Sequence, residues 1–330
     1  MFIATINLIY FLLLILFFLV TCITWKIYIK LRIKPINSYT CMFKKVVIIT
    51  GANSGLGFET ALELSKRGAK IILACRNATK AQRAVKNIIY QTENKNVFHK
   101  HLDLASFSSI RNFVKEIYEN EKKIDVLINN AGIGGIDDQL TEDGHLTMIQ
   151  VNYLGHFLLT NLLIDKLKES PGSRIINLTS NLAKRSDLNL KNFTNYPYFK
   201  QNYFARKSMY SNSKLCMIYF TQEISRKLCC HGITVNAVHP GAILTGVWDI
   251  PELFKNIIKL IGFYFFKTVE EGSRTIIYLA TSQDVKNVTG GLFENCAEIK
   301  MYKTARNPNL GIELWELSEK LVNLYKKKIM

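Results

Sequence analysis

The sequence has little proline and no cysteine motif. It contains 6 Pro and 18 Gly in 330 residues, which is too few for a collagen-like or low-complexity chain. Its 7 Cys are scattered and form no Cys-x-x-Cys pair, so neither a disulfide framework nor a zinc site is indicated. We therefore expect one globular unit in a reducing compartment, with no bound metal.

Acidic residues are scarce relative to basic ones. The chain has 43 Lys and Arg against 26 Asp and Glu, a formal net charge of +17. Such an excess suits nucleic acid, an anionic membrane surface or an anionic cofactor. Because the basic residues are dispersed and no recognition motif is present, we expect no nucleic-acid partner.

The N-terminal segment lacks charge altogether. No charged residue occurs between Phe2 and Trp25, and at about 1.5 Å per residue this run is long enough for a hydrocarbon core of about 30 Å. A cleaved signal peptide is the alternative, but such peptides begin with basic residues and end in small ones, whereas this run ends in Trp25 and Lys26. The predicted parts are a transmembrane anchor at residues 1–25, a basic linker at 26–43 and one domain at 44–330.

Basic residues follow the apolar run and none precedes it. They are Lys26, Lys30, Arg32, Lys34, Lys44 and Lys45. The positive-inside rule then places the rest of the chain in the cytosol. Four Asn-x-Ser/Thr sequons would argue for a lumenal domain, but Asn177 lies inside an apolar strand pattern where a glycan could not attach.

From residue 46 onward, short β-branched runs alternate with longer amphipathic segments. Strands that are buried on both faces and joined by helices predict an α/β fold, a Rossmann-type doubly wound parallel sheet in a single domain. The predicted strands are 46–50, 71–75, 97–102, 126–129, 174–178 and 233–238. The predicted helices are 57–67, 80–91, 108–118, 146–167 and 205–228, followed by a last helix carrying Leu314, Leu317, Leu321 and Leu324.

A glycine-rich loop lies directly between the first predicted strand and the first predicted helix. Glycines there let the backbone approach a pyrophosphate, which exposed N–H groups and the helix N-terminus hold. A plain strand–helix turn is the alternative reading, and the position in the pattern favours nucleotide binding. The residues of this predicted cofactor loop are Gly51, Ala52, Asn53, Ser54, Gly55, Leu56 and Gly57.

The end of the second predicted strand indicates which dinucleotide would bind. NAD-binding units carry an acidic residue at this point, but this strand is followed by Arg76 with no Asp or Glu beside it in sequence. A guanidinium fork fits a ribose 2′-phosphate, so NADP(H) is favoured, although a solvated surface charge is the plainer reading. Asp103, after the third strand, could accept a hydrogen bond from the adenine amine or could serve only as a loop or helix cap.

Tyr210 and Lys214 are four residues apart in a long helical pattern, so they project from one face. A nearby cation favours the phenolate over a phenol whose usual pKa is about 10, which would make Tyr210 a usable acid and base. Ser180 directly follows the fifth predicted strand, at the carboxyl edge of the sheet, where it could hydrogen-bond a reacting oxygen. Each residue alone has a structural explanation, but together with the glycine loop they predict an active site.

These motifs, in this order, resemble the short-chain dehydrogenase/reductase family. The resemblance also rests on Asn129-Asn130-Ala131-Gly132 after the fourth strand and His239-Pro240-Gly241 after the sixth. Segments 73–76, 151–160 and 210–215 are similar to those of the membrane-anchored, NADP-dependent retinol dehydrogenases. The family's Arg-Asp and Ser-Ser pairs read Arg76-Asn77 and Thr179-Ser180 here, which bears on substrate identity more than on activity.

The resemblance implies roles for individual residues. Asn152 matches an asparagine that holds a water between the lysine and solvent, so the implied catalytic group is Ser180, Tyr210, Lys214 and Asn152. Lys214 and Tyr210 would also bind the nicotinamide ribose, Asn130 would line the adenosine side, and Ser180 would contact the substrate. Thr245 follows the Pro-Gly turn, where the family contacts the carboxamide or the diphosphate.

The implied activity is hydride transfer between NADP(H) and a lipophilic alcohol or aldehyde such as retinol or retinal, at the cytosolic face of the endoplasmic reticulum membrane. A steroid or other lipid carbonyl is the second substrate class. The aromatic residues that would line the cleft, or only cover the core, are Tyr196, Tyr198, Phe199, Tyr203 and Phe204. A non-catalytic NADP-binding membrane scaffold is a different reading, which the intact Ser180, Tyr210 and Lys214 disfavour.

A second apolar segment, residues 253–267, mixes aromatic residues with lysines. It is short for a membrane span and is interrupted by Lys255 and Lys259. An interfacial segment that contacts the bilayer fits this composition, and a helix buried against the sheet fits it equally well.

Overall fold

A twisted sheet of eight strands forms the centre of the domain in the computed structural model, which describes residues 2–32, 40–134, 139–193, 203–243 and 266–324. The strand order is β3-β2-β1-β4-β5-β6-β7-β8, parallel except for β8. The strands are β1 Val46–Thr50, β2 Lys70–Cys75, β3 Val97–His101, β4 Val126–Asn129, β5 Arg174–Leu178, β6 Thr234–Val238, β7 Leu292–Glu294 and β8 Ala297–Ile299. This topology confirms the predicted doubly wound α/β fold.

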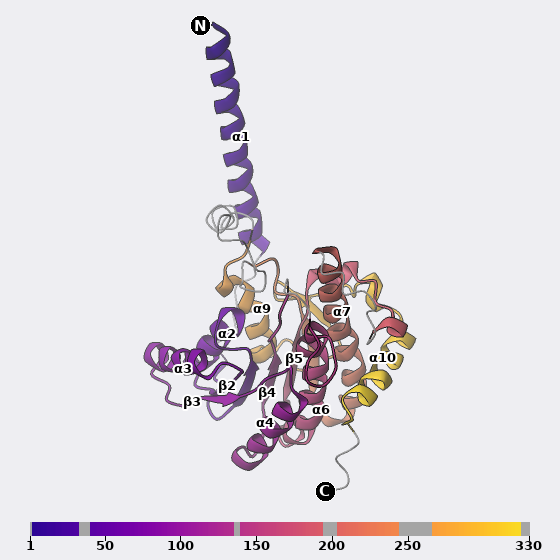
Figure 1. The fold of residues 1–330 in the computed structure, drawn as a ribbon. Helices are drawn as coiled ribbons and strands as arrows, with labels where there is room; N and C mark the ends of the chain where they lie inside the picture. The colour runs from indigo at the N-terminus through magenta and orange to yellow at the C-terminus, as the bar shows by residue number, and fades with distance from the viewer. Residues whose placement is uncertain (1, 33–39, 135–138, 194–202, 244–265, 325–330) are drawn as a thin grey trace.

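Helices cover both faces of the sheet (Figure 1). One face carries α2 Gly55–Lys66, α3 Ala78–Thr92 and α9 Val269–Thr281. The other carries α4 Phe107–Asn120, α6 Gly155–Lys168 and α7 Tyr203–Leu228, with α10 Pro308–Leu321 packed on α7. The short helices are α5 Thr147–Ile149, η1 Gln150–Leu154, η2 Asn181–Arg185, η3 Leu190–Asn192, η4 Cys229–His231 and η5 Lys303–Ala305.

Aromatic packing fixes the position of α7, the helix that carries Tyr210 and Lys214. The Phe157 ring of α6 lies 5.3 Å from that of Phe220 on α7 and 4.9 Å from that of Trp315 on α10, centroid to centroid. Tilted and edge-on pairs at such distances each contribute about 0.5–1.5 kcal/mol beyond the area they bury. The three helices therefore form one rigid support for the residues at the sheet edge.

Within the described residues near the C-terminus, the sequence pattern did not predict strands β7 and β8 or helix α9. Strands β7 and β8 have three residues each, too few for a period-2 pattern to stand out. Helix α9 carries a sequence signal, a capping box in which Thr268 accepts from the Glu271 amide and Glu271 accepts from the Thr268 amide. This signal would have revealed α9.

The predicted helix 146–167 is also interrupted. It is divided into α5, the π-helical turn η1 and α6. At Gly155, the first residue of α6, a Cβ atom would lie 2.7 Å from the Leu104 carbonyl oxygen. A glycine is therefore required where this helix passes the loop after β3.

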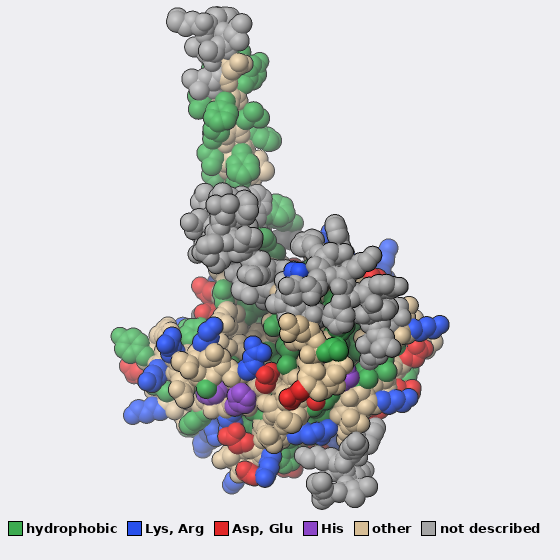
Figure 2. Space-filling model, in the orientation of Figure 1, with side chains coloured by type: hydrophobic (Ala, Val, Ile, Leu, Met, Phe, Trp, Pro, Cys, Tyr) green, Lys and Arg blue, Asp and Glu red, His purple; other side chains and the backbone are tan. Residues whose placement is uncertain are grey.

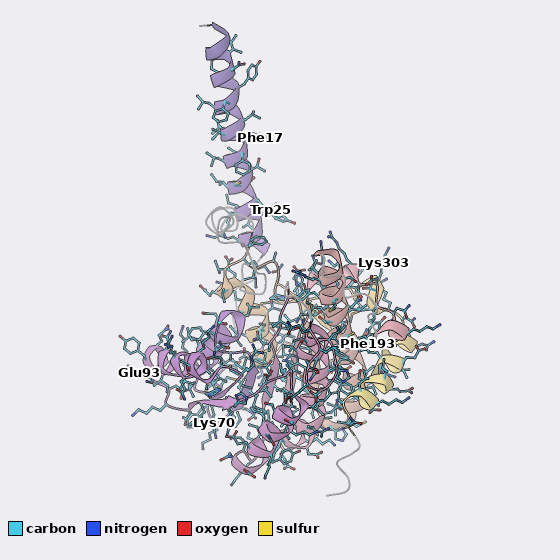
Figure 3. All side chains as sticks on the ribbon, viewed as in Figure 1. Phe17, Trp25, Lys70, Glu93, Phe193 and Lys303 are labelled. Atoms are coloured by element: carbon cyan, nitrogen blue, oxygen red, sulfur yellow. The ribbon has the colours of Figure 1, made fainter. Side chains whose placement is uncertain are left out.

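Helix α1, Phe2–Arg32, projects away from the domain and exposes apolar side chains along its length (Figures 2 and 3). By length and composition alone, the segment Ile9–Tyr28 could cross a membrane. Phe17 and Trp25, which project outward from it, are 72% and 44% exposed. The helix continues beyond the predicted end at Trp25 to Arg32, so the first part of the predicted linker is helical.

Candidate active site

Three of the predicted catalytic residues meet at the carboxyl ends of the central strands. Tyr210 and Lys214 lie one turn apart in α7, and both are buried. The Lys214 Nζ atom is 5.7 Å from the centre of the Tyr210 ring. The Ser180 hydroxyl, directly after β5, lies within hydrogen-bonding reach of Tyr210. The structure thus brings these three side chains together at the edge where ligands of such sheets bind.

The Tyr210 hydroxyl keeps its proton at neutral pH. Burial raises the pKa of Tyr210 to about 12, and the hydrogen bond with Ser180 offsets only part of this shift. Among the protein groups alone, removal of the phenolate from water outweighs the effect of the nearby cation on this pKa. The predicted lowering by the lysine together with an oxidised nicotinamide stays a prediction. A protonated tyrosine beside the site is suited to donate a proton to a carbonyl oxygen.

Lys214 is held by the end of β5. Its Nζ donates to the Leu178 carbonyl oxygen at 3.3 Å, and the Thr179 hydroxyl donates to the Lys214 carbonyl oxygen at 2.7 Å. Burial lowers the pKa of Lys214 to about 8, since the charged amine loses hydration. The lysine therefore remains mainly charged at neutral pH and titrates just above it.

Asn152 lies in the π-helical turn η1 and is fully buried. Its side chain accepts from the Ile133 amide at 2.8 Å and donates to the Ile133 carbonyl at 2.9 Å and to Ser213 Oγ at 3.0 Å. A Cβ atom on Gly132 would lie 3.1 Å from Lys214 Nζ and 3.4 Å from Asn152 Oδ1. The lysine and the asparagine thus flank the same glycine.

The glycine loop has the backbone geometry that its sequence predicts. Gly51 and Gly55 have φ of +67° and +58°, which glycine adopts readily. A Cβ on Gly57 would lie 2.5 Å from Asn130 Nδ2, and that amide donates to the Thr50 carbonyl oxygen at 2.7 Å. Asn130 therefore braces the loop from the end of β4.

The start of α2 suits an anion. Ser54 occupies the N-cap position without a side-chain capping bond among the described residues, so the first amide groups of α2 can hold a phosphate. Ala52 is buried under the turn, while Asn53, Ser54 and Leu56 line its more open side. These residues fit the diphosphate of a dinucleotide.

Arg76 and Asp103 lie closer together than the sequence indicated. Arg76 follows β2 with its side chain 70% exposed, and its Nη1 lies 4.0 Å from Asp103 Oδ2. The expectation that no acidic residue stands beside Arg76 is wrong, because the ends of β2 and β3 are neighbours. Asp103 Oδ1 also accepts from the Ala105 amide at 2.9 Å, so this carboxylate shapes the turn before α4.

The substitution of Asn77 for the family's aspartate has a local explanation. Asn77 is the N-cap of α3, and its Oδ1 accepts from the Lys80 amide at 2.8 Å. Asparagine and aspartate are equally good at this position. The change therefore preserves the turn that follows Arg76.

Several predicted residues lie outside the described part of the chain. They are Thr245, Tyr196, Tyr198, Phe199 and residues 253–265 of the second apolar segment. The side chains of Tyr203 and Phe204 are likewise not described. The substrate-binding surface and the Thr245 contact therefore stay predictions.

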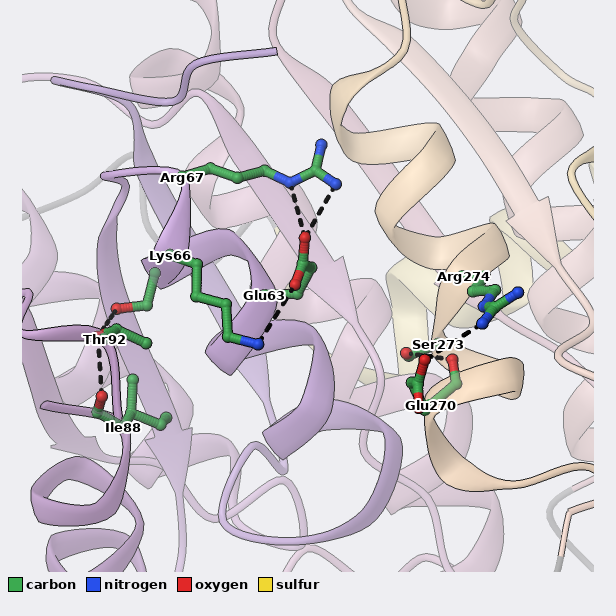
Figure 4. A network of polar contacts seen from close by, with 9 residues as sticks. Glu63, Lys66, Arg67, Ile88, Thr92, Glu270, Ser273 and Arg274 are labelled. Carbon is green, nitrogen blue, oxygen red and sulfur yellow. Dashed lines mark hydrogen bonds and ion pairs between the residues drawn. The ribbon is translucent and has the colours of Figure 1, made fainter. Parts of the chain in front are cut away.

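A cavity of about 610 Å³ lies elsewhere, between α2 and α9 (Figure 4). Glu63 pairs there with Arg67 at 3.0 Å, and Glu270 pairs with Arg274 at 3.2 Å. Two of the acidic side chains on its walls thus have a basic partner at close range. Tyrosine and histidine are absent from the described part of its lining, whereas Ser180, Tyr210 and Lys214 meet at the sheet edge.

A sequence model of the family described as short chain dehydrogenase matches residues 45–196 and 199–250. Retinol dehydrogenase 14 of Homo sapiens is 39% identical over 301 residues, which cover 86% of this chain and 88% of that protein. Retinol dehydrogenase 13 of Homo sapiens is 41% identical over 287 residues, covering 85% of each. Both alignments cover more than four fifths of each chain.

Solved structures share the fold. The crystal structure of an uncharacterized protein from Mycobacterium paratuberculosis matches with a TM-score of 0.68 at 29% identity, covering 86% of this chain and 95% of that one. A short chain dehydrogenase from Escherichia coli, complexed with NADPH, matches with a TM-score of 0.60 at 20% identity, covering 78% and 99%. The second likeness concerns the fold alone.

Proposed function

The chain belongs to the short-chain dehydrogenase family, and we propose that it transfers a hydride between NADP(H) and a lipophilic alcohol or aldehyde, with retinol and retinal as the substrate pair. The family and its retinol dehydrogenase relatives make the chain an oxidoreductase that acts on alcohols with a nicotinamide cofactor. The observation that carries the finer proposal is the group formed by Ser180 and the buried Tyr210 and Lys214 beside a glycine loop.

In reduction, Tyr210 donates its proton to the carbonyl oxygen of the substrate. Its raised pKa keeps this proton available at neutral pH, and the Ser180 hydroxyl supplies a second hydrogen bond to the same oxygen as negative charge develops. Lys214 is charged and lies one turn from Tyr210. Its positive charge stabilises the developing negative charge and, after the proton has been transferred, the phenolate left on Tyr210. A nicotinamide bound beside these residues would supply the hydride in reduction and accept it in oxidation.

The choice of NADP(H) rests on Arg76. Its exposed guanidinium at the end of β2 is positioned to pair with a 2′-phosphate. The Asp103 carboxylate at 4.0 Å is too distant for a strong hydrogen bond with the guanidinium, so the arginine retains donors for a phosphate. Gly51, Ser54, Gly55 and Gly57 would hold the diphosphate, and Asp103, Asn130 and Thr245 stay candidate contacts.

We propose that α1 anchors the enzyme in a membrane with the domain on the cytosolic side, in the endoplasmic reticulum. The exposed apolar surface of α1 supports the anchor, and the basic residues in its last two turns and after it support the orientation. The proposed division is an anchor at residues 1–25, a linker at 26–43 and the catalytic domain at 44–330, with the linker helical up to Arg32. A lipid-dissolved substrate would reach such an enzyme directly.

A substrate screen tests this proposal. The full chain in detergent is mixed with NADPH or NADH and with retinal, a steroid ketone or a fatty aldehyde, and loss of reduced cofactor is followed by absorbance. We expect retinal with NADPH to give the highest kcat/KM. A preference for the steroid would move the proposal to the second substrate class. Tight NADPH binding without turnover on any carbonyl would favour the scaffold reading.

A further inference from the structure

A buried histidine that the proposed mechanism does not use lies between the glycine loop and the turn that carries Asn152. His156 is the second residue of α6 and is 0% exposed. Its Nε2 lies 3.0 Å from Thr50 Oγ1, and its Nδ1 lies 3.3 Å from the Asn152 carbonyl oxygen. A single imidazole therefore contacts both the end of β1 and the π-helical turn.

The contacts of the Thr50 hydroxyl fix the direction of these hydrogen bonds. The amides of Asn130 and Ala131 both donate to Thr50 Oγ1 at 2.9 Å. A hydroxyl has two acceptor sites and one proton, so this proton is left for an acceptor, and His156 Nε2 at 3.0 Å is nearer than the Ile128 carbonyl at 3.4 Å. His156 then carries its own proton on Nδ1, which donates a hydrogen bond to the Asn152 carbonyl oxygen.

The assignment requires a neutral imidazole. Burial, reinforced by the charge of Lys214, lowers the pKa of His156 to about 3. A protonated ring could only donate through both nitrogens and would lose the bond from Thr50. The electrostatic environment thus agrees with the hydrogen-bond directions.

We propose that His156 is a positioning residue that fixes the cofactor loop and the Asn152 turn relative to each other. Thr50 immediately precedes Gly51 of the loop. On the other side, Asn152 Nδ2 donates to Ser213 Oγ at 3.0 Å, and Ser213 donates to the Tyr210 carbonyl at 2.8 Å. The imidazole thereby joins the cofactor-binding side of the site to the helix that bears Tyr210. This inference rests on the proposed function.

Two substitutions separate the two bonds. In His156→Asn the amide reaches about as far as Nδ1 and can still donate to the Asn152 carbonyl, but it cannot reach Thr50. In His156→Gln the amide reaches about as far as Nε2 and can still accept from Thr50, but the donor to Asn152 is lost. A structural role alone would not make the two variants differ in opposite directions.

We expect a split between cofactor affinity and turnover. His156→Asn should weaken NADP⁺ binding by about tenfold with kcat within about threefold of wild type, as for loss of one buried hydrogen bond at the loop. His156→Gln should lower kcat by about tenfold with NADP⁺ affinity within about threefold. The full chain in detergent is used, with affinity measured by calorimetry and kcat by NADPH consumption.

Ser173→Ala is the matched control. Ser173 is 1% exposed, and its hydroxyl donates to the Leu167 carbonyl oxygen at 2.8 Å, so the variant also leaves a buried polar group without its partner. Ser173 directly precedes β5 and so lies at the opposite edge of the sheet from Ser180. The substitution should lower the melting temperature while leaving affinity and kcat unchanged. Equal losses of both parameters in the two His156 variants, or no loss in either, would overturn the proposal.

Affinity and amide exchange keep the test independent of the substrate. If the wild-type chain binds NADP⁺ but reduces no carbonyl, the proposed function fails, yet calorimetry still decides whether His156→Asn weakens the loop. Hydrogen–deuterium exchange at residues 150–155 then shows whether the hydrogen bond from His156 Nδ1 to the Asn152 carbonyl oxygen stabilises this turn. Faster exchange in His156→Gln than in His156→Asn supports it, and equal exchange contradicts it.

Discussion

Tyr210 and Lys214 share one buried face of α7, with the Lys214 ammonium 5.7 Å from the centre of the Tyr210 ring. Burial moves their pKa values in opposite directions, to about 12 for Tyr210 and to about 8 for Lys214. As the pH rises, Lys214 therefore loses its charge before Tyr210 loses its proton. In carbonyl reduction, alkaline inactivation should report the lysine.

The first prediction concerns this alkaline limb. The kcat for reduction should fall as pH rises through about 8, because Lys214 loses the charge that stabilises the developing oxyanion. Lys214→Arg keeps its charge at all accessible pH values, so its lower kcat should be flat over pH 7 to 10. The measurement is kcat as a function of pH for both proteins. If kcat of the arginine variant falls above pH 8 as it does in the wild type, the titrating group is not Lys214.

The second prediction concerns cofactor choice. Arg76→Asp replaces an attraction for the 2′-phosphate with a repulsion and should move preference from NADPH toward NADH by about 10- to 1000-fold in kcat/KM, or about 1.4 to 4 kcal/mol. Arg83→Asp makes the same charge change at an exposed position on α3 and should leave the preference as it is. Equal use of both cofactors by the wild-type enzyme would refute the role of Arg76.

The third prediction concerns acid stability. Burial lowers the pKa values of both His156 and His239 to about 3, while in the unfolded chain histidine titrates near 6.5. Below about pH 6.5 the unfolded state therefore binds more protons, and each histidine lowers the free energy of unfolding by up to about 1.4 kcal/mol per pH unit. His156→Gln should have a shallower loss of stability between pH 6.5 and 4.5, measured by urea unfolding. Identical slopes for variant and wild type would contradict this account.

The fourth prediction concerns membrane contact. Lys26 on α1 donates to the Phe266 carbonyl oxygen at 3.4 Å, which supports a position of residue 266 near the base of the anchor. If residues 253–267 enter the bilayer interface, a chain lacking residues 1–40 should still sediment with anionic liposomes. Replacing Phe263, Phe265 and Phe266 with Ser should release it and spare reduction of a small soluble aldehyde. A truncated chain that stays in the supernatant would leave α1 as the sole membrane contact.

The strands and most helices could be predicted because the buried positions are occupied by apolar residues in a regular pattern along the sequence. The β-branched runs of β1, β4 and β5 are buried on both faces, and the glycines at 51 and 55 occur where φ is positive. Strands β7 and β8 could not be found, because three residues carry no readable period. The π-helical turn was missed since its residues continue the apolar pattern of the helices around it.

At the site, the sequence predicted which residues come together, but not their pKa shifts or the charged groups that lie next to them. Tyr210, Lys214 and Ser180 were found from spacing and position, whereas the direction of the Tyr210 pKa shift depends on how deeply the ring is buried. The approach of Asp103 to Arg76 depends on which strands are neighbours. His156 lies in segment 151–160, which carries the resemblance, but the sequence gave it no role. Its role depends on the positions of Thr50 and the Asn152 carbonyl oxygen, which only the fold brings next to it.

The most direct test of the central claim is the rate of NADPH consumption with retinal by the full chain carrying Tyr210→Phe. This change deletes the proton donor and leaves the ring and the cofactor loop in place, so turnover should fall below a thousandth of the wild-type rate while NADPH affinity, measured by calorimetry, stays within about threefold. Lys214→Ala should weaken both. Turnover of Tyr210→Phe above a thousandth of wild type would show that the proton comes from another group and that the assigned active site is wrong.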